Sequence, residues 1–538
     1  QFTGPECTEC ADPMFTGPEC DPCVDQKFTG PECTECANPA YTDAKCVGPY
    51  RQVAPLSTAR STSNRPMFRV ALPGDLDGAR ITLCAEVDCT TVLMDFEIGV
   101  EGGTPPTPLP AGPVYWYAEG IAGGVVSTEP SHTWQLHIPA HPAPHGTAWG
   151  TTFDLELDGY ADVLVGSCGL SGCMEMVGLH RGGEGGSSHH PDQLIVDPNS
   201  AVSFGFSVSS AGDVNGDGLP DLIVGAGLGD SAQVFLNSPE GILPDPVQSW
   251  IVAGAWFGFS VSSAGDVNGD GYGDVVVGSM LGFSAFLYYG GPEGPGPGPN
   301  TALSTGAFGF GVSVSSAGDV NGDGYEDLIC GAANGFPPEA SIWYGGPDGP
   351  DAVADLVLTG DVTFGISVRG AGDVNGDGYA DVIVGDAETG TFVVHHGGPD
   401  GLDPEPATVG TGSAGYSISV AGAGDLNGDG YGDVVAGGDD TAGVYYGSAT
   451  GIAEEPSVML LGEAGSQFGD SVACLGDTNG DGFDDLGVGA PSAVMVIGFP
   501  GSAEGVSEAS NVIMTLEEPG EDEPANAGYG FSVGNSVR

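Results

Sequence analysis

Apolar and polar residues alternate over short segments through much of the chain, and turns rich in glycine and proline separate these segments. Between residues 51 and 140, stretches such as ARITLCAEVD and HTWQLHIP place an apolar residue at about every second position. A period of two predicts β-strands with one buried and one solvated face. We therefore predict a small antiparallel β-sandwich at 51–140, followed by a proline-interrupted linker.

A different pattern repeats over residues 145–538. Each unit begins with an aromatic-Gly strand such as FGFSVSSAGD at 204, continues into a nonapeptide rich in Asp and Gly, and enters an apolar run such as DLIVGAG. Two weaker strands then end in phrases such as YYGG at 288–291. Four short strands in each repeat predict a β-propeller rather than a helical solenoid. Six clear nonapeptides recur at intervals of 52 to 54 residues, beginning at 213, 266, 319, 373, 425 and 477.

Two further segments bear on the number of blades and on how the ring closes. DLELDGYAD at 154–162 keeps acids at positions 1, 5 and 9 and glycine at 6, so it predicts a seventh loop and a seventh blade. YGFSVGNSV at 529–537 matches the first strand of a unit, whereas the first unit has only the shortened counterpart HGTAWGTTF. We predict that 529–537 closes the first blade of a propeller at 145–538; a stub of a longer array is the alternative.

Residues 1–46 follow a third pattern, in which FTGPEC recurs every 13 residues. So few aliphatic residues cannot build a core, and we predict a stalk held by disulfides, with zinc as the alternative for the CxxC pairs. Because the sequence begins within a repeat, we expect either further copies upstream or a link from Cys7 to another chain. The cysteines of this region have C-x2-C-x9-C spacing and stand at 7, 10, 20, 23, 33, 36 and 46.

Composition narrows the location and the partners. The chain has 73 acidic and 10 basic side chains, a net charge of −63, so its surface repels nucleic acid and anionic lipid and attracts divalent cations or basic partners. Thirteen cysteines indicate an oxidising compartment, and hence a secreted or cell-surface protein. We see no signal peptide, and expect a mature form. No apolar run approaches the roughly 20 residues that span a bilayer, so we expect no transmembrane segment.

The nonapeptide places oxygen ligands at alternate positions, as a loop around a hard cation requires. Acids at 1, 5 and 9, Asn at 3 and the backbone carbonyl at 7 supply the oxygens. Glycine at 6 permits the turn, and the side chain at 7 is left free. The lack of Cys and His disfavours zinc and copper, and Mg²⁺ would keep more of its own waters. Asp-Gly turns with solvated acids are the alternative to calcium.

The six clear nonapeptides define six calcium sites, and 154–162 defines a seventh that departs from them at Glu156, which stands where the others have Asn. Three acids within a few ångströms repel one another without a cation, so we expect calcium to be chiefly structural. The ligands predicted at the departing site are Asp154, Glu156, Asp158, Tyr160 and Asp162. Those at the clear sites are Asp213, Asn215, Asp217, Leu219, Asp221, Asp266, Asn268, Asp270, Tyr272, Asp274, Asp319, Asn321, Asp323, Tyr325, Asp327, Asp373, Asn375, Asp377, Tyr379, Asp381, Asp425, Asn427, Asp429, Tyr431, Asp433, Asp477, Asn479, Asp481, Phe483 and Asp485.

The aromatic-Gly strand and the loop after it, FG…GD-x-N-G-D-G-xx-D, resemble the FG-GAP repeats of integrin α-subunit propellers and their bacterial relatives. This resemblance covers about 390 of 538 residues. It implies a seven-bladed propeller with calcium in hairpin loops on one face and partners bound on the opposite face. The sequence departs from the pattern where Tyr416-Ser417 replaces Phe-Gly and where Glu156 replaces Asn.

The two N-terminal regions carry shorter resemblances. FTGPEC resembles the last loop of EGF-like and laminin-type modules, which implies disulfides 10–20, 23–33 and 36–46 and leaves Cys7 unpaired. PVYWYAEG and HTWQLHI resemble the last two strands of fibronectin type III domains.

Other reactive side chains define no second site. Cys84 and Cys89 are close enough in sequence to pair, whereas Cys330 and Cys474 lie in predicted strands of different blades and are expected to be buried free thiols. We find no G-x-S-x-G, no H-E-x-x-H and no phosphate-binding glycine loop, and therefore predict that the protein is not an enzyme.

These features predict a calcium-stabilised recognition or adhesion protein, secreted or at the cell surface, that binds an extracellular protein or glycan through propeller loops. Two alternatives stay open. In the first, the chain is the structural subunit of an extracellular fibre or surface assembly, with its cysteine stalk and propeller surface in contact between copies. In the second, it is a secreted polysaccharide hydrolase or lyase whose carboxylates stand among the loop acids.

Overall fold

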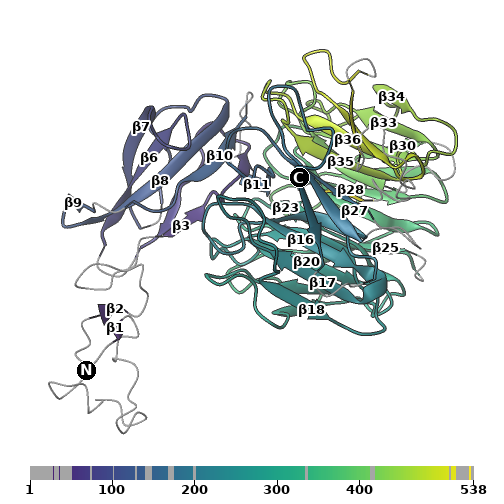
Figure 1. Cartoon of the computed structure of the whole chain (residues 1–538), viewed down its shortest axis with the longest axis horizontal. Helices are drawn as coiled ribbons and strands as arrows, with labels where there is room; N and C mark the ends of the chain where they lie inside the picture. Colours follow the sequence, from purple (N-terminus) through teal and green to yellow (C-terminus); the bar gives the residue numbers. More distant parts are fainter. Residues whose placement is uncertain are drawn as a thin grey trace, which may run out of the picture.

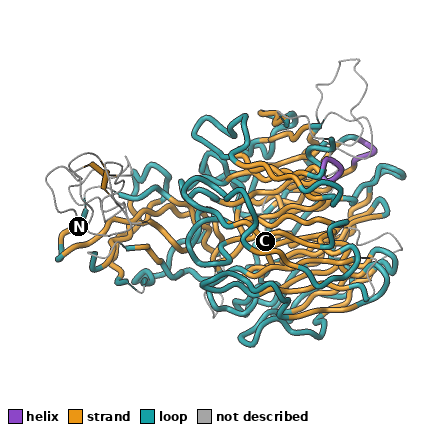
Figure 2. The backbone as a smooth tube through the Cα atoms, turned by 90° about the horizontal axis from the view of Figure 1, so that it is seen from below, coloured by secondary structure: helices purple, strands orange, loops and turns teal. Residues whose placement is uncertain are grey.

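The regular structure of the chain is almost entirely β, apart from two short 3₁₀ turns at Gly227–Gly229 and Pro491–Ala493. The predicted all-β class is therefore confirmed for the described residues. Figures 1 and 2 show a smaller β body, built from strands before residue 151, beside a larger array built from the later strands. The computed structural model describes residues 28–29, 35–36, 51–72, 76–100, 102–127, 130–139, 148–167, 175–197, 202–333, 337–411, 419–507, 511–515 and 532–534.

The cysteine-repeat region contributes one strand pair to the described structure. Strand β1 (Phe28–Thr29) pairs antiparallel with β2 (Glu35–Cys36). The predicted disulfides 10–20, 23–33 and 36–46, and the unpaired Cys7, involve side chains outside the described residues. The disulfide-held stalk therefore stays a prediction.

The smaller body, which we call the sandwich body, contains the strands between residues 51 and 151. Phe68, Trp116 and Trp134 are fully buried in it and meet edge to face at 4.9 and 5.7 Å. The disulfide predicted between Cys84 and Cys89 is confirmed. A seven-stranded sheet has the order β11-β4-β10-β8-β6-β7 with β9 beside β8, and β3 pairs with β5. The strands are β3 (Arg51–Ala54), β4 (Ala59–Ser61), β5 (Arg69–Ala71), β6 (Gly78–Cys84), β7 (Val92–Ile98), β8 (Gly112–Ala122), β9 (Val125–Val126), β10 (Trp134–Ile138) and β11 (Ala148–Thr151).

Two features of the sandwich body differ from the antiparallel sandwich predicted at 51–140. Strand β10 pairs with β4 in parallel, because β4 reaches it through a long crossover rather than a hairpin. Strand β11 pairs with β4, so this sheet continues to Thr151. The prediction that HGTAWGTTF is a shortened blade strand is therefore wrong. Alternation of residues predicts a strand but not its partner, which depends on contacts far apart in sequence.

The larger array consists, in the described part of the chain, of seven four-stranded antiparallel sheets. The innermost strand of each sheet contacts the innermost strands of its two neighbours, so these contacts run around a full circle. The sequence places a closing strand at 529–537, and β39 (Ser532–Gly534) pairs there with β12, the second strand of the first sheet. It lies between β35 and β15. This arrangement is consistent with a β-propeller.

We count the strands of each sheet outward from the centre. The fourth strands alternate buried and exposed residues, so the outer edge of each sheet is partly solvated. The first strands, apart from β39, are β15 (Ser207–Gly212), β19 (Phe257–Gly265), β23 (Phe310–Gly318), β27 (Phe364–Gly372), β31 (Ser419–Gly424) and β35 (Ser471–Gly476). The second strands are β12 (Val163–Gly166), β16 (Asp221–Ala226), β20 (Asp274–Ser279), β24 (Asp327–Ala332), β28 (Asp381–Asp386), β32 (Asp433–Gly438) and β36 (Asp485–Ala490). The third strands are β13 (Met176–His180), β17 (Ser231–Phe235), β21 (Ser284–Tyr288), β25 (Glu339–Trp343), β29 (Thr391–His395), β33 (Thr441–Tyr445) and β37 (Met495–Phe499). The fourth strands are β14 (Gln193–Val196), β18 (Gln248–Ile251), β22 (Thr301–Leu303), β26 (Leu356–Thr359), β30 (Thr408–Thr411), β34 (Val458–Leu461) and β38 (Val512–Met514).

Two glycines in a unit let neighbouring sheets approach closely. Gly258, from an aromatic-Gly pair, has a φ of +81°, and its carbonyl oxygen lies 2.2 Å from where a Cβ would stand on Gly225 of the preceding unit. Any side chain at Gly225 would push the two sheets apart. The FG phrase and the glycine that ends the apolar run therefore position neighbouring sheets. The same contact joins Gly166 to Gly205, Gly278 to Gly311, Gly331 to Gly365 and Gly437 to Gly469.

The six clear nonapeptides join first strands to second strands, and 154–162 leads from β11 into the second strand β12, so all seven loops lie at one end of the strands. Figure 2 shows the sandwich body against one end of the strands and the other end pointing away from it. We number the loops 1 to 7 along the chain and call loops 2 to 7 the clear loops. Loop 1 is 154–162, and the clear loops begin at 213, 266, 319, 373, 425 and 477.

Candidate metal centre

Each clear loop is a closed turn in which the first and last carboxylates accept backbone N–H groups. In loop 3, Asp266 accepts the N–H groups of Asp270 at 3.0 Å and Gly271 at 2.8 Å. Asp274 accepts the N–H group of Val267 at 3.0 Å. Equivalent bonds recur in the other clear loops. The local sequence therefore folds each loop around its own carboxylates.

The first and last carboxylates of the clear loops are buried or half-buried, and no ion pair to them is found among the described residues. In loop 3, Asp266 is 8% exposed and Asp274 is fully buried. Burial raises the pKa of Asp266 to about 7 and that of Asp274 well above its usual range, and neighbouring loop carboxylates raise both further. Among described residues, the ion pairs reach none of the acids at positions 1, 5 and 9 of the clear loops. Several carboxylate oxygens gathered in a buried turn without an ion pair fit a hard divalent cation.

The structure places the predicted ligands of a clear loop in two groups. The acids at positions 1 and 9 are buried or half-buried, whereas Asn at 3 and Asp at 5 bond to each other nearer the surface. Asn268 donates to Asp270 at 3.1 Å, and Asp270 accepts the N–H group of Tyr272 at 3.0 Å. Calcium binding at the clear loops stays a prediction. Three acidic side chains whose oxygens lie within 4.8 Å of one another occur, in the described part of the chain, at loop 1: Asp154, Glu156 and Asp162.

The side chain at position 7 is not free, and that prediction is wrong. A Cβ on Gly269, at position 4 of loop 3, would lie 2.5 Å from the ring of Tyr325, at position 7 of loop 4. The Tyr325 ring therefore packs on the glycine of the preceding loop, and the same packing recurs at other junctions. The signal in the sequence was the joint presence of glycine at 4 and an aromatic residue at 7. Further pairs are Gly216 with Tyr272, Gly376 with Tyr431, Gly428 with Phe483, and Gly480 of loop 7 with Tyr160 of loop 1.

A backbone hydrogen bond also joins successive loops. The N–H group at position 8 donates to the carbonyl at position 1 of the preceding loop, as from Gly273 to Asp213 at 2.7 Å. Equivalent bonds of 2.8 to 3.3 Å run from loop 4 to loop 3 and onward to the bond between loops 1 and 7. Between loops 1 and 2 this bond is impossible, because position 8 of loop 2 is Pro220. Asn237 instead donates its side-chain amide to the carbonyl of Leu155 at 2.9 Å.

Loop 1 differs from the clear loops in its packing as well. Leu157 stands at position 4, where the clear loops have glycine, with a φ of +53°. It packs with Tyr115 of the sandwich body, and Leu219 of loop 2 packs against the same cluster. Two leucines therefore take the place of the glycine and the ring. Glu156 forms an ion pair with Arg181 at 2.7 Å.

The sandwich body meets the propeller at loops 1 and 2. Gln135 donates its amide to Asp154 at 3.1 Å. Tyr115 donates its hydroxyl to the backbone of loop 1 at 3.1 Å, and Ser57 donates to the backbone of loop 2 at 2.6 Å. The sandwich body thus makes hydrogen bonds to both loops of the junction that lacks the loop-to-loop bond.

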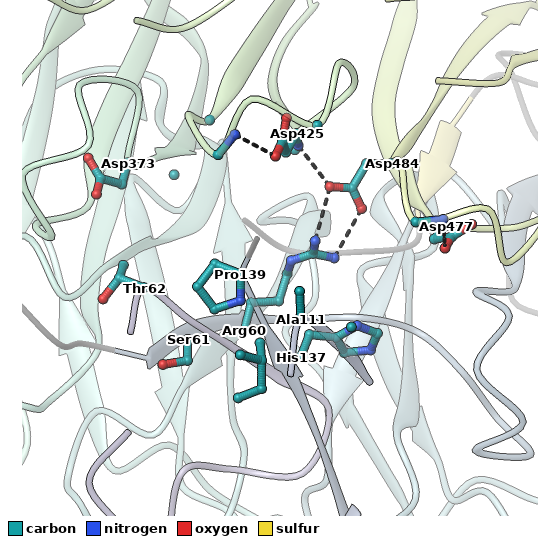
Figure 3. Close-up of a pocket in the computed structure, with 18 of the residues that line it drawn as sticks. Arg60, Ser61, Thr62, Ala111, His137, Pro139, Asp373, Asp425, Asp477 and Asp484 are labelled. Carbon is teal, nitrogen blue, oxygen red and sulfur yellow. Dashed lines mark hydrogen bonds and ion pairs between the residues drawn. The ribbon is translucent and has the colours of Figure 1, made fainter. Parts of the chain in front are cut away.

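Two arginines extend this contact to loops 3 and 7. Arg51 lies 4.2 Å from the centre of the Tyr272 ring and donates to the backbone of loop 3. Arg60 makes two hydrogen bonds with Asp484, at 3.0 and 3.1 Å (Figure 3). Asp484 is nearly inaccessible and also accepts the N–H group of Asp425 at 2.8 Å. Positive charge from the sandwich body therefore meets negative charge on the loops.

A cavity of about 260 Å³ lies beside the Arg60 contact (Figure 3). Thr62 and His137 line it from the sandwich body, and Asp373 and Asp477 line it from loops 5 and 7. Burial, with Arg60 nearby, lowers the pKa of His137 to about 3, so this side chain is neutral at pH 7. The sandwich body therefore leaves space beside its direct contact with loop 7.

The opposite end of the propeller carries rings near the starts of first strands and on the turns after second strands. Trp256 and Phe259 stack at 5.8 Å, and Phe283 and Phe308 lie 5.0 Å apart. Phe308 is 54% exposed. Asp230 accepts the N–H group of Trp256 at 2.7 Å and holds its turn in place. We call this group the aromatic patch: Phe206, Trp256, Phe259, Phe283 and Phe308.

The remaining sequence predictions concern cysteines and one departing repeat. Cys330 and Cys474 are buried and free, as predicted. The departure at Tyr416-Ser417 lies outside the described residues.

The fold and the loops agree with a comparison to known families. Residues 213–277 and 373–436 match the family described as FG-GAP-like repeat, and residues 310–349 match the FG-GAP repeat. The chain therefore carries FG-GAP repeats, and the predicted resemblance is confirmed for these residues. The resemblances of 1–46 to EGF-like modules and of 51–140 to fibronectin type III domains stay predictions.

Relatives of the chain include integrins. Integrin alpha-5 of Xenopus laevis is 32% identical over 223 residues, which cover 36% of this chain and 21% of the relative. Integrin alpha-V of Gallus gallus is 27% identical over 241 residues, which cover 40% of this chain and 23% of the relative. The chain thus spans less than a quarter of either relative.

A solved structure adds little. A 6-phosphogluconolactonase candidate from Bacteroides fragilis covers 70% of this chain and 98% of its own length, at 11% identity and a TM-score of 0.45. A likeness of this size indicates no function. In the described residues, the structure contains no helix with the length and apolar character needed to cross a membrane.

Proposed function

We propose that the chain is a calcium-stabilised recognition or adhesion protein, secreted or at the cell surface, and not an enzyme. In this proposal a seven-bladed propeller binds an extracellular protein or glycan through the end that carries the aromatic patch. The FG-GAP repeats and the integrin relatives support a recognition or adhesion role. The observation that carries the choice of surface is the position of the sandwich body, which occupies the loop end.

The aromatic patch has the properties of a binding surface. Aromatic side chains are enriched in the centres of protein interfaces, and rings also stack on the apolar faces of sugars. Asp230 fixes the backbone turn of Trp256 and the Trp256 ring stacks on Phe259, so this side chain loses little freedom when a partner binds. On a chain with a net charge of −63, a group of half-buried and exposed rings at one end of the strands is a distinct feature.

Calcium has a structural role in this proposal. Each loop holds acids that repel one another, and a cation bound at that loop removes the repulsion. When bound, calcium supplies positive charge and oxygen coordination to the loop, and the acids at positions 1 and 9 hold it from the buried side. The loops then keep neighbouring sheets in register, and the patch at the other end stays rigid.

A binding screen with patch variants tests the proposed surface. The chain is immobilised in millimolar calcium and exposed to arrays of extracellular proteins and of glycans. Trp256→Ala and Phe308→Ala are expected to lose the binding that the unchanged chain shows. The control is Val353→Ala, because Val353 is 76% exposed between β25 and β26, at the end of the strands opposite the patch. Equal binding by all three variants would place the partner surface elsewhere.

A second candidate is self-association into a surface assembly, favoured by the outer strands. Each of these strands pairs with one neighbouring strand in the described structure, and they expose Leu194 and Ile251 at 51% and 72%. Exposed apolar edges are templates for pairing between chains. Light scattering in calcium decides between the candidates. A particle of 53.9 kDa supports recognition by a monomer, and growth into large ordered particles supports assembly.

A further inference from the structure

We propose that loop 1 is a divalent-cation site shared between the propeller and the sandwich body, in which Gln135 positions the ligand Asp154. The inference rests on the cation binding proposed above and adds a second role for this one loop. A cation at loop 1 would hold the sandwich body on the propeller as well as stabilise the turn. The acid cluster, the amide of Gln135 and the junction between loops 1 and 2 each support it.

The acid cluster of loop 1 is more compact than those of the clear loops. Asp154 and Asp162 are 1% and 2% exposed, and their oxygens lie within 4.8 Å of each other and of a Glu156 oxygen. The clear loops have Asn where loop 1 has Glu156. Loop 1 therefore offers one more carboxylate to a hard cation, and carboxylate oxygens are the ligands that such cations prefer.

The amide of Gln135 lies directly against this cluster. Gln135 is fully buried on β10 and donates to Asp154 at 3.1 Å. Its own amide oxygen has no hydrogen-bond partner among the described residues. A buried polar atom without a partner is the feature expected beside an ion or its coordinated water. A hydrogen bond onto a ligand carboxylate also orients that ligand. With loops 2 and 3, the sandwich body bonds to backbone carbonyls instead.

The junction between loops 1 and 2 explains why this site also bears on the contact between the two bodies. Pro220 removes the bond that joins the other loops. Trp134, the neighbour of Gln135 on β10, fills the junction: a Cβ on Gly218 would lie 3.0 Å from its ring. Repulsion among the loop 1 acids would therefore disturb the surface on which β10 rests.

Arg181 competes with a cation for this site. Its guanidinium pairs with Glu156 at 2.7 Å, and both side chains are partly exposed, at 42% and 32%. The ion pair joins one positive charge to one acid of a three-acid cluster, and it lies on the exposed side of that cluster. A divalent cation at loop 1 must share or displace this contact. We therefore expect loop 1 to bind calcium more weakly than the clear loops, giving two classes of site.

Titration of the calcium-free full chain with calcium, and with Tb³⁺ as a luminescent probe, tests this expectation. The unchanged chain should show a tight class and one weaker site. Asp154→Asn should remove the weaker site, whereas the matched change Asp373→Asn in loop 5 should remove one tight site. Gln135→Met should weaken the weaker site about 10- to 100-fold, as loss of a ligand's supporting hydrogen bond does. Arg181→Gln, an exposed change, should strengthen it.

Hydrogen–deuterium exchange of β8 and β10 measures the contact between the bodies. Calcium should slow exchange over residues 112–122 and 134–138 in the unchanged chain, in Asp373→Asn and in Arg181→Gln. It should not slow exchange in Asp154→Asn or Gln135→Met. Circular dichroism confirms that each variant is folded. If Gln135→Met does not fold, Arg181→Gln still tests the shared site.

The outcomes separate this inference from the proposed function. If Asp154→Asn and Arg181→Gln leave the number and affinity of the sites unchanged, Arg181 alone neutralises loop 1 and the shared site is overturned. The clear loops would still bind calcium in that case, and the proposed function would stand. If the unchanged chain binds no cation, the calcium part of the proposed function fails, and this inference fails with it.

Discussion

The junction of loops 1 and 2 holds neighbouring blades together by contacts that differ from those at the other junctions. At other junctions, a ring at position 7 covers the glycine of the preceding loop, as Tyr325 covers Gly269, and a backbone bond from position 8 reinforces the pair. At the junction of loops 1 and 2, Leu157 and Leu219 replace the glycine and the ring, and Pro220 removes the bond. The sandwich body supplies contacts there instead.

This difference shows that the departures in loops 1 and 2 form a set. A leucine at position 4 leaves no room for a ring from the next loop, so position 7 of loop 2 must change as well. The leucines then form an apolar surface for Tyr115. A departure from a repeat therefore marks the place where another part of the chain attaches.

Removal of calcium should have the largest effect, because it acts on all the clear loops at once. Each site contributes about 2.7 kcal/mol when free calcium is about 100 times its Kd. The propeller transition should therefore fall steeply in excess EGTA, as measured by scanning calorimetry. The sandwich body has an apolar core and a disulfide of its own and should melt at nearly its usual temperature. A thermogram that EGTA leaves unchanged would refute the structural role of calcium.

Loss of the Arg60 contact should have the next largest effect. Arg60→Ala leaves Asp484 buried without its partner, which costs about 3–5 kcal/mol of unfolding free energy. Arg80→Ala is the control, because its ion pair with Glu97 is exposed, with 3.4 Å between the charged atoms. That pair should contribute under about 1 kcal/mol. Urea unfolding measures the loss of unfolding free energy in both variants. Equal losses would show that the buried pair contributes no more stability than the exposed pair.

A change at position 4 tests the packing of the clear loops. Gly269→Ala puts a Cβ 2.5 Å from the Tyr325 ring at a φ of +70°. The left-handed backbone costs about 1–2 kcal/mol and the overpacking about 1–3 kcal/mol of unfolding free energy. Tyr325→Leu, which imitates Leu219, should recover part of this loss in the double variant. If the two losses simply add, the ring and the glycine are not coupled.

Pro220→Ala should have the smallest effect. It restores an N–H group near the carbonyl of Asp154, and a new hydrogen bond contributes about 0.5–1.5 kcal/mol. The change also frees the unfolded chain, which costs about 0.4–1 kcal/mol. We therefore expect the unfolding free energy to stay within about 1 kcal/mol, as measured in urea. A large gain in stability would mean that the sandwich body does not already support this junction.

Much of the fold was predictable because it repeats. The all-β class, the FG-GAP repeats, the pairing of Cys84 with Cys89 and the burial of Cys330 and Cys474 were predicted correctly. Each depends on residues close together in sequence or on a pattern that recurs. The partners of β4 were not predictable in this way, because β10 and β11 lie far from it along the chain.

The same distinction between local features and long-range contacts applies to the candidate site. The residues of a single nonapeptide specify its loop, since the acids at positions 1 and 9 and the glycine turns act within nine residues. The packing of position 7 on another loop, and the contacts of Gln135 with Asp154 and of Arg60 with Asp484, follow only from the assembled fold. These contacts join segments tens to hundreds of residues apart. Local patterns determine how each loop folds, and the ring of sheets determines what each loop touches.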